Sequence, residues 1–264
     1  MSETAKLLLQ KDGLIGWIVF NQPEKRNAVS QEMWELMPGY AHELATDEAI
    51  RVVVLRGAGD RAFVAGADIS QFKDRRRNMA DEEEYRRISG RGQESLGTLT
   101  KPLLAMIHGY CVGGGVGIAV ACDIRIAADD ASFGIPAARL GLGYHYHGME
   151  KLMKLIGPAY TKEIFFTART DFTAADALRM GLVNQVVPKA ELEAFTRSYA
   201  ERMARNAPLT LRSAKATVEQ LLRPPADRDL ALLDKLMADC FNSQDYQEGV
   251  KAFSEKRRPQ FQGR

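Results

Sequence analysis

The chain has 264 residues, with 36 basic and 34 acidic side chains, and its formal net charge at pH 7 is only +2. This balance excludes the strong basic footprint with which many proteins bind nucleic acid or acidic membranes. The longest apolar runs fall short of the roughly 18 residues that span a bilayer, and residues 1–13 lack the regions of a secretory signal. We therefore expect a cytoplasmic protein with no nucleic-acid or membrane partner.

The cysteines indicate neither a disulfide framework nor a metal site. Cys111, Cys122 and Cys240 are few, odd in number and far apart, a pattern that predicts free thiols in a reducing compartment. The four histidines show no metal-ligand spacing beyond the close pair His145 and His147. We expect no metal.

Strands and helices alternate through the first two thirds of the chain. Apolar periodicity and breaker residues predict, in order, strands at 5–10 and 14–20, a helix from residue 31, a strand at 51–57, a loop at 62–70, a charged helix within 73–91, strands at 101–109, 123–128 and 131–134, a helix from 149, and a helix followed by a strand within 171–188. Asp12-Gly13 marks the first hairpin turn, and Ser30 is the expected N-cap of the first helix.

The rest of the chain is predicted to be helical, at 192–204, 209–222, 227–242 and 246–256. This order argues for an α/β domain with a helical C-terminal region, and we divide the chain at 1–200 and 201–264. The apolar faces of the last helices need a partner, either the α/β domain or another subunit.

Three consecutive glycines, Gly113 to Gly115, stand between a predicted strand and a predicted helix. Glycine is costly to order, so the cluster suggests that something approaches this backbone closely. The first N–H groups of a helix lack an intrahelical acceptor and lie at its electropositive end, which suits an anion or a developing oxyanion. The alternatives are close helix–strand packing and a dinucleotide-binding turn, for which the spacing in "GYCVGGGVG" is wrong.

Four further motifs surround the glycines. They are "FNQPEKRNAVS", "RAFVAGADIS", "SFGIPAARLGLG" and, near the C-terminus, "EGVKAFSEKRRPQF". In this order they resemble the crotonase (enoyl-CoA hydratase/isomerase) superfamily over about residues 15–261. The resemblance implies an α/β fold, a spiral of ββα turns followed by helices that assemble a homotrimer or, by pairing of trimers, a hexamer. It also implies an acyl-CoA substrate, with coenzyme A present as part of the thioester and no permanently bound cofactor.

The resemblance assigns site residues by matching motifs. The backbone N–H groups of Ala67 and Gly114 would hold the thioester oxygen as it becomes an enolate. The implied CoA contacts are Lys25, Arg26, Ala28, Ala65, Asp68, Ile69, Phe253 and Lys256, the last two often reaching the CoA of a neighbouring subunit. Asp68 is alternatively a catalytic carboxylate, but the family favours a role in bracing the loop. Lys25 and Arg26 are alternatively an ordinary exposed basic pair.

At two positions the sequence departs from the hydratase pattern. Hydratases of the family carry one glutamate where this chain has Gly117 and another where it has Ala137. Addition of water by the paired acid–base route is therefore unsupported, as is isomerisation with the second glutamate as base.

A polar segment, Tyr144 to His147, replaces the small apolar loop that faces the acyl group in hydratases. Histidine is the commonest general acid–base residue near neutral pH, and a tyrosine hydroxyl donates hydrogen bonds to carboxylate or thioester oxygens. We predict that Tyr144 and His145 supply the acid–base chemistry. The alternative is that this segment packs against the last helix or a neighbouring subunit.

Three functions remain open. The first is an enolate-forming acyl-CoA enzyme of the enoyl-CoA hydratase/isomerase kind. The second is a lyase like the methylmalonyl-CoA decarboxylase branch, which also lacks the glutamates and has a tyrosine at the position of Tyr144, but a histidine at that of Ala67. The third is a CoA-binding assembly protein without catalysis. We expect His42 and His108 to be structural.

Overall fold

The computed structural model describes residues 5–68 and 79–264. Ile69, one of the expected CoA contacts, lies outside the described residues. The helices are α1 (Gln31–Thr46), α3 (Met79–Gly97), α4 (Gly114–Ala119), α5 (Tyr146–Thr167), α6 (Ala174–Met180), α7 (Leu192–Ala204), α8 (Pro208–Leu221), α9 (Leu230–Phe241) and α10 (Gln244–Ser254). As predicted, the Ser30 hydroxyl caps α1 by accepting a hydrogen bond from the Met33 N–H at 3.3 Å.

A six-stranded sheet forms the centre of the fold, in the order β1-β2-β3-β5-β7-β10. Its strands are β1 (Leu7–Asp12), β2 (Ile15–Phe20), β3 (Val52–Gly57), β5 (Leu103–Ile107), β7 (Ile124–Ala128) and β10 (Gln185–Val187). β1 and β2 form the predicted antiparallel hairpin, and the other neighbours are parallel. Gly13 has a φ of +56° in the hairpin turn, as the Asp-Gly signal requires.

A second, four-stranded sheet has the order β4-β6-β8-β9. Its strands are β4 (Ala62–Val64), β6 (Tyr110–Val112), β8 (Ser132–Gly134) and β9 (Phe172–Thr173). The predicted loop at 62–70 is therefore wrong where β4 lies, and the sequence analysis does not predict β6. Both strands are only three residues long, too short to show a period, and pairing between segments far apart in the sequence creates them.

The chain coils as a spiral. Each turn places one strand in the large sheet, the next strand in the small sheet and then a helix: β3, β4 and α3, then β5, β6 and α4, then β7, β8 and α5. The predicted α/β spiral of ββα turns is confirmed. α5 begins at Tyr146, earlier than the predicted start at 149, so Tyr146 and His147 belong to its first turn and not to a loop.

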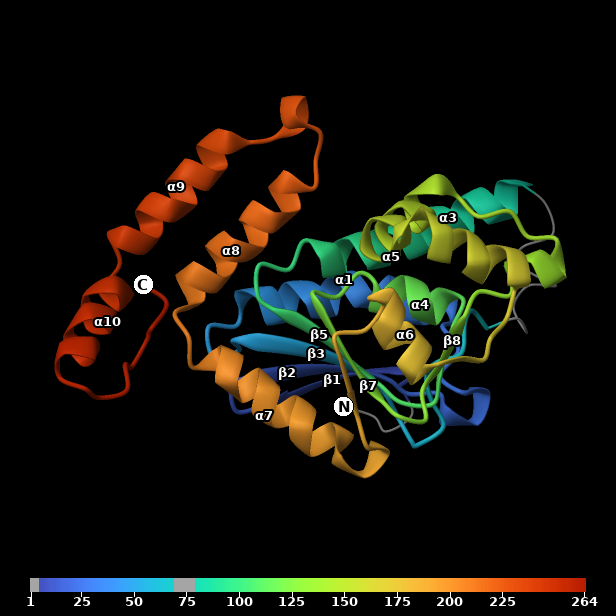
Figure 1. The fold of residues 1–264 in the computed structure, drawn as a ribbon, viewed down its shortest axis with the longest axis horizontal. Helices are drawn as coiled ribbons and strands as arrows, with labels where there is room; N and C mark the ends of the chain where they lie inside the picture. The colour runs from blue at the N-terminus through green and yellow to red at the C-terminus, as the bar shows by residue number, and fades with distance from the viewer. Residues whose placement is uncertain (1–4, 69–78) are drawn as a thin grey trace.

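The large sheet is buried on both faces. Along β3, Val53 and Leu55 contribute to one apolar cluster, whereas Val52 and Val54 contribute to another. The first cluster also takes in α1 and α4, and the second takes in α7, which covers the opposite face (Figure 1). Burial on both faces is typical of parallel strands between helices and explains why the β3 sequence does not alternate with polar residues.

The C-terminal helices α8 to α10 extend away from the core as an arm (Figure 1). Lys215 of α8 connects the arm to the core through an ion pair with Asp123, with Nζ and Oδ2 2.8 Å apart. The division at 1–200 and 201–264 stays a prediction; α7 crosses it and ends at Ala204. Among the described residues, we find no helix with the length and apolar character to cross a membrane.

The three cysteines are free thiols. Cys111 and Cys122 are buried, and burial raises the pKa of the Cys122 thiol to about 12. Cys240 on α9 is partly exposed. The buried thiols are therefore protonated and unreactive at neutral pH.

Candidate active site

The segments that follow β4 and β6 lie against each other. The two strands are parallel neighbours, so the chain leaves both at the same edge of the small sheet. A Cβ placed on Gly114 would lie 3.8 Å from the backbone nitrogen of Ala67 and 3.7 Å from the carbonyl carbon of Gly66. The structure thus brings the two residues of the predicted oxyanion site into contact.

The backbone pairing around Ala67 does not use the Ala67 N–H. Val29 donates its N–H to the Gly66 carbonyl at 2.8 Å and accepts the Asp68 N–H at 3.0 Å. This pairing uses the groups on either side of Ala67 and turns the Ala67 N–H away from Val29. Within residues 5–68 and 79–264, neither the Ala67 N–H nor the Gly114 N–H donates to a carbonyl oxygen.

The three consecutive glycines have different physical roles. Gly113 has a φ of +55°, which turns the chain from β6 into α4. A Cβ on Gly115 would lie 2.1 Å from the Val64 carbonyl oxygen, so this glycine is required for close packing of α4 on β4. Gly114 faces the Ala67 backbone and is partly exposed. Close packing and an open backbone, the two alternatives from the sequence, therefore both apply, each to a different glycine.

Neither Gly117 nor Ala137, the two positions at which the sequence analysis notes the absence of a glutamate, carries an acid–base side chain. Gly117 is partly exposed, and a Cβ placed on it would lie 3.9 Å from Nε2 of Gln93. Ala137 is 6 % exposed and begins a 3₁₀ turn whose end is fixed by the Leu142 N–H, which donates to the Ala137 carbonyl at 3.1 Å. The sequence analysis did not select Gln93 as a site residue. The one signal in the sequence is that this polar residue follows Gly92 and precedes the apolar Leu96 in a helical pattern.

Asp68 connects the polar loop at 22–28 to the end of β4. Its carboxylate, on a residue that is 6 % exposed, accepts hydrogen bonds from Lys25 Nζ at 2.8 Å and Gln22 Nε2 at 3.3 Å. The Ala65 N–H adds a second connection by donating to the Arg26 carbonyl at 3.0 Å. A carboxylate with this set of donors is suited to bracing a loop and poorly suited to taking a proton.

The other predicted CoA contacts in this region lie together around β4 and β6. The Arg26 guanidinium lies over the Tyr110 ring, 4.7 Å from its centroid, and Arg26 has a left-handed φ of 53°. Ala28 is buried and Ala65 is partly exposed. The loop therefore presents Arg26 at the surface, while the charge of Lys25 is paired with Asp68.

The polar segment at the start of α5 includes one packed residue and two exposed ones. Tyr144 is half-buried, and its ring meets the Phe165 ring edge-on, with centroids 5.0 Å apart at 73°. His145 stands at the N-cap position of α5 without capping it through its side chain, and its ring lies 4.2 Å from that of Tyr146. His145 and Tyr146 are both exposed.

A family model described as enoyl-CoA hydratase/isomerase matches residues 10–264. The chain belongs to the enoyl-CoA hydratase/isomerase family. The short-chain-enoyl-CoA hydratase of Clostridium acetobutylicum is 33 % identical over 256 residues, and the crotonyl-CoA hydratase of Syntrophomonas wolfei is 31 % identical over 255; each alignment covers 97 % of both chains. A solved enoyl-CoA hydratase/carnithine racemase from Magnetospirillum magneticum superposes with a TM-score of 0.94 at 32 % identity, covering 99 % of this chain and 97 % of that one.

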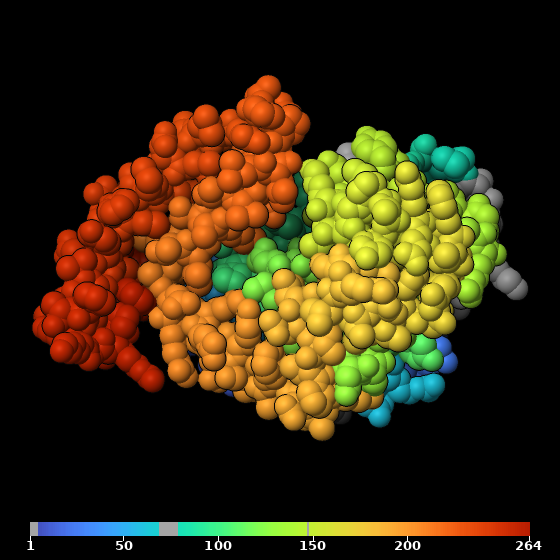
Figure 2. All heavy atoms as spheres, viewed as in Figure 1, coloured from blue at the N-terminus to red at the C-terminus, as the bar shows by residue number. Residues whose placement is uncertain are grey.

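In this family member, two of the predicted CoA contacts lie far from the others. Phe253 and Lys256 are exposed at the end of α10, and the space-filling view shows the red C-terminal helices at the opposite end of the molecule from α5 (Figure 2). They do not join the other site residues within one chain.

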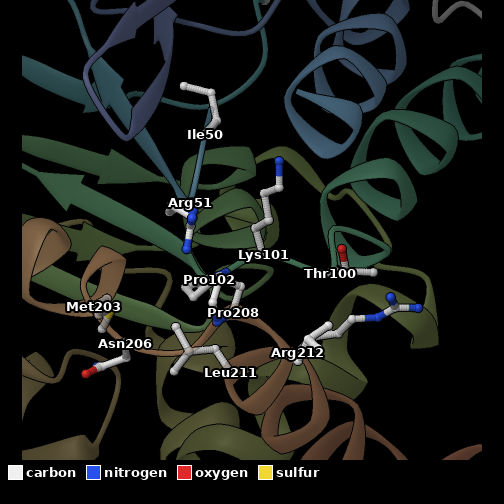
Figure 3. Close-up of a pocket in the computed structure, with 11 residues that line it drawn as sticks. Ile50, Arg51, Thr100, Lys101, Pro102, Met203, Asn206, Pro208, Leu211 and Arg212 are labelled. Carbon is white, nitrogen blue, oxygen red and sulfur yellow. The ribbon is translucent and has the colours of Figure 1, made fainter. Parts of the chain in front are cut away.

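A partly open cavity of about 100 Å³ lies elsewhere, at the amino ends of β3 and β5 against the start of α8 (Figure 3). Two of its cationic side chains donate to backbone carbonyls: Lys101 Nζ donates to those of Leu44 and Asp47 at 2.6 and 2.7 Å, and Arg51 donates to that of Phe261 at 3.2 Å. The cavity is thus an apolar gap between the core and the arm, and no predicted site residue lines it. The described part of the chain also holds no group of three or more metal-ligating side chains.

The two remaining histidines lie in different environments. His42 is exposed on α1. His108 is 6 % exposed, its Nε2 atom finds no hydrogen-bond partner in the parts of the chain that the structure describes, and burial lowers its pKa. Neither contributes to the group of residues around Ala67 and Gly114.

Proposed function

We propose that the protein is an acyl-CoA enzyme that stabilises a thioester enolate between the N–H groups of Ala67 and Gly114. The observation that supports this most is the contact of two backbone segments, each with a donor that engages no carbonyl of the described residues. Such donors act on charge that develops in the transition state, and removing one typically costs about 10²–10³ in rate.

The proposed CoA site is the surface formed by the loop at 22–28 and the end of β4. Arg26 supplies a guanidinium for a phosphate, Lys25 contributes its charge from the pair with Asp68, and Ala28 and Ala65 allow the backbone to approach the ligand. Ile69 belongs to the same proposed site.

Phe253 and Lys256 would complete the CoA site of a neighbouring copy in a homotrimer or hexamer. Their distance from the site within one chain and the exposure of the apolar faces of α8 to α10 support this assembly. We further propose that the protein works in the cytoplasm.

Tyr144 and His145 are the proposed acid–base groups. Gly117 and Ala137 carry no carboxylate, so a proton must come from another side chain, and Tyr144 is held in place by its contact with Phe165. The substitutions Tyr144→Phe and His145→Ala should each lower kcat on the true substrate about 10²-fold, the usual scale for an acid or base. Thioester affinity should change little because the proposed CoA contacts lie elsewhere.

Decarboxylation is a second candidate, and the empty positions 117 and 137 favour it. In a malonyl-type thioester, the carbon–carbon bond to the carboxylate breaks and CO₂ leaves. The electron pair of that bond stays on the thioester and forms the enolate, which then takes a proton. This route requires the oxyanion donors and one proton source but no base.

One experiment tests these proposals together. The protein is incubated with enoyl-, 3-hydroxyacyl- and malonyl-type CoA esters, and the products are followed by mass spectrometry. We expect turnover of one class and weak or absent hydration of crotonyl-CoA. Rapid crotonyl-CoA hydration that survives both single substitutions would overturn the acid–base assignment. Binding without any turnover would identify a CoA-binding protein instead.

A further inference from the structure

Gln93 lies over the exposed face of α4. Its amide nitrogen is 3.9 Å from the position of a Cβ on Gly117, and within residues 5–68 and 79–264 no other atom beyond the adjoining chain and helix backbone lies within 4 Å of that position. Gly117 is partly exposed, whereas its neighbours Val116 and Ile118 are buried. The amide therefore borders the open space that a side chain at 117 would otherwise fill.

The helix that carries Gln93 is firmly positioned. A Cβ on the adjacent Gly92 would lie 2.7 Å from a ring carbon of Trp34 and 3.1 Å from the Trp34 carbonyl oxygen, so α3 packs directly on α1 there. Ser89 and Leu96, which lie one turn before and one turn after on the same side, are buried. This packing fixes the rotation of α3 and with it the direction of the Gln93 side chain.

The Gln93 amide has unused hydrogen-bonding capacity. A primary amide offers two donors and one acceptor, and the structure gives it no hydrogen bond to any residue in 5–68 or 79–264. The side chain is half-buried, so an apolar group placed against it would strip it of water without replacing those hydrogen bonds. An apolar acyl chain there would leave these groups unsatisfied and therefore bind more weakly.

The separation of Gly114 and Gly117 along α4 tells how far the Gln93 amide lies from the proposed enolate site. Gly114 and Gly117 are three residues apart on one side of the helix, a rise of about 4.5 Å. Gly114 faces Ala67, and Gly117 faces Gln93. An acyl group that runs along this side of α4 from a thioester oxygen between Ala67 and Gly114 would bring its third or fourth carbon near the Gln93 amide.

We infer that Gln93 is a specificity-determining residue, and that the acyl group of the substrate carries a second oxygen, a carbonyl or hydroxyl, at about its third or fourth carbon. This inference rests on the proposed acyl-CoA function. Gln93 cannot replace a glutamate as a base, because an amide neither takes nor gives a proton at neutral pH. It binds the distal oxygen, and sites built around such a bond discriminate strongly against analogues without the oxygen.

The test compares two thioesters of equal chain length, 4-oxopentanoyl-CoA and pentanoyl-CoA, by calorimetric measurement of Kd. Neither is a substrate for hydration or decarboxylation, so binding alone is measured. The unmodified protein should bind the oxo ester about tenfold more tightly, the equivalent of one good hydrogen bond. In Gln93→Met, which keeps the length of the side chain, the ratio should fall to about one, with the Kd of pentanoyl-CoA nearly unchanged.

Two controls make the outcome decisive. Gln10→Met changes an exposed glutamine on the edge strand β1 and should keep the ratio. If Gln93→Met folds poorly, Gln93→Asn withdraws the amide by one methylene and should also lower the ratio. A ratio near one in the unmodified protein, or an unchanged ratio in the Gln93 variants, overturns this inference alone. Failure of the unmodified protein to bind either ester or free CoA overturns the proposed function instead.

Discussion

All residues of β2 and β5 in the core are buried, whereas Leu236 is the only buried residue of α9, a helix that the structure describes in full. The arm exposes a series of large apolar side chains, each between 49 and 88 % exposed: Val218, Leu221, Leu222, Leu230, Met237, Phe241, Tyr246, Val250 and Phe253. Monomeric soluble proteins rarely leave so much apolar surface in one region. The core thus buries its apolar side chains within one chain, whereas the arm leaves many of its apolar side chains exposed.

Within the arm, polar contacts hold the end of the chain. The buried Asp245 carboxylate accepts the N–H groups of Gln262 and Gly263 at 2.6 and 2.8 Å. The Arg257 guanidinium, paired with Glu248, holds the pKa of that carboxyl down at about 2. The arm is therefore ordered by local hydrogen bonds and ion pairs, while the core is ordered by burial. An ordered arm with exposed apolar side chains is suited to binding further copies of the chain, as we propose.

The largest expected effect is a break in the packing of the core. Gly115→Ala places a methyl group 2.1 Å from the Val64 carbonyl oxygen, which backbone movement must relieve. We expect a loss of about 3 kcal/mol or more in the free energy of unfolding, or failure to fold. Urea denaturation measures it.

Gly117→Ala is the matched control, because it lies on the same helix and, among the described residues, its new methyl group would meet only Gln93 Nε2, at 3.9 Å. Its free energy of unfolding should stay equal or rise by up to about 1 kcal/mol, since alanine favours helix. Equal losses in the two variants would show that packing of α4 on β4 does not determine the stability of this region.

A charge on the exposed face of the arm should break the assembly and spare the core. Val250→Asp places a carboxylate on α10 at a side chain that is 57 % exposed in the single chain. If this face meets another copy, burying the unpaired charge costs roughly 3 kcal/mol, about a hundredfold in the dissociation constant. Light scattering should show a smaller mass, with circular dichroism unchanged.

Leu178→Asp on α6, at a site 46 % exposed in the core, is the control and should keep the mass. A monomeric mass for the unmodified protein at micromolar concentration would contradict the proposed trimer or hexamer.

Removing the carboxylate of Asp245 should loosen only the last residues. Asp245→Ala deprives the Gln262 and Gly263 N–H groups of their acceptor, a loss of about 1–3 kcal/mol that is confined to this tail. Hydrogen exchange of these two amides should accelerate while core amides stay protected. Asp239→Ala removes a carboxylate that pairs with Lys235 on the same arm and should leave the tail unchanged; acceleration there too would refute the assignment.

The smallest effect concerns a buried ionisable group in the core. Burial, with a contribution from the Lys189 charge, lowers the pKa of His108 below its usual 6.5. The folded state therefore favours the neutral ring of His108. The contribution of this ring to the free energy of unfolding is complete above pH 6.5 and is lost as the pH falls below that value toward the lowered pKa.

His108→Gln should consequently reduce the fall in Tm between about pH 7.5 and pH 5.5. The control His42→Gln, at an exposed position on α1, should keep the full fall. An unchanged pH dependence in His108→Gln would show that another group is responsible.

Much of the candidate site was predictable because its motifs are contiguous. Ala67 and Gly114 follow from "AGAD" and "GGG", and the structure puts these two segments in contact. The interpretation of Lys25 as a simple phosphate contact is incomplete, because its partner Asp68 stands 43 residues away in the chain. Gln93 could not be selected from the residues around it in the sequence. A half-buried glutamine in a helix is common, and only the structure shows that Gly117 lies opposite it.

The sequence by itself determined the features whose causes are local. The Asp12-Gly13 turn, the Ser30 cap and the bounds of α7 follow from neighbouring residues, because turn, cap and helix energies depend on contacts only a few positions apart. Only the tertiary structure decided the strands β4 and β6, the separate roles of Gly114 and Gly115, and the placement of Gln93 over Gly117. Each depends on a partner brought near by a different turn of the spiral, and no short stretch of sequence contains both partners.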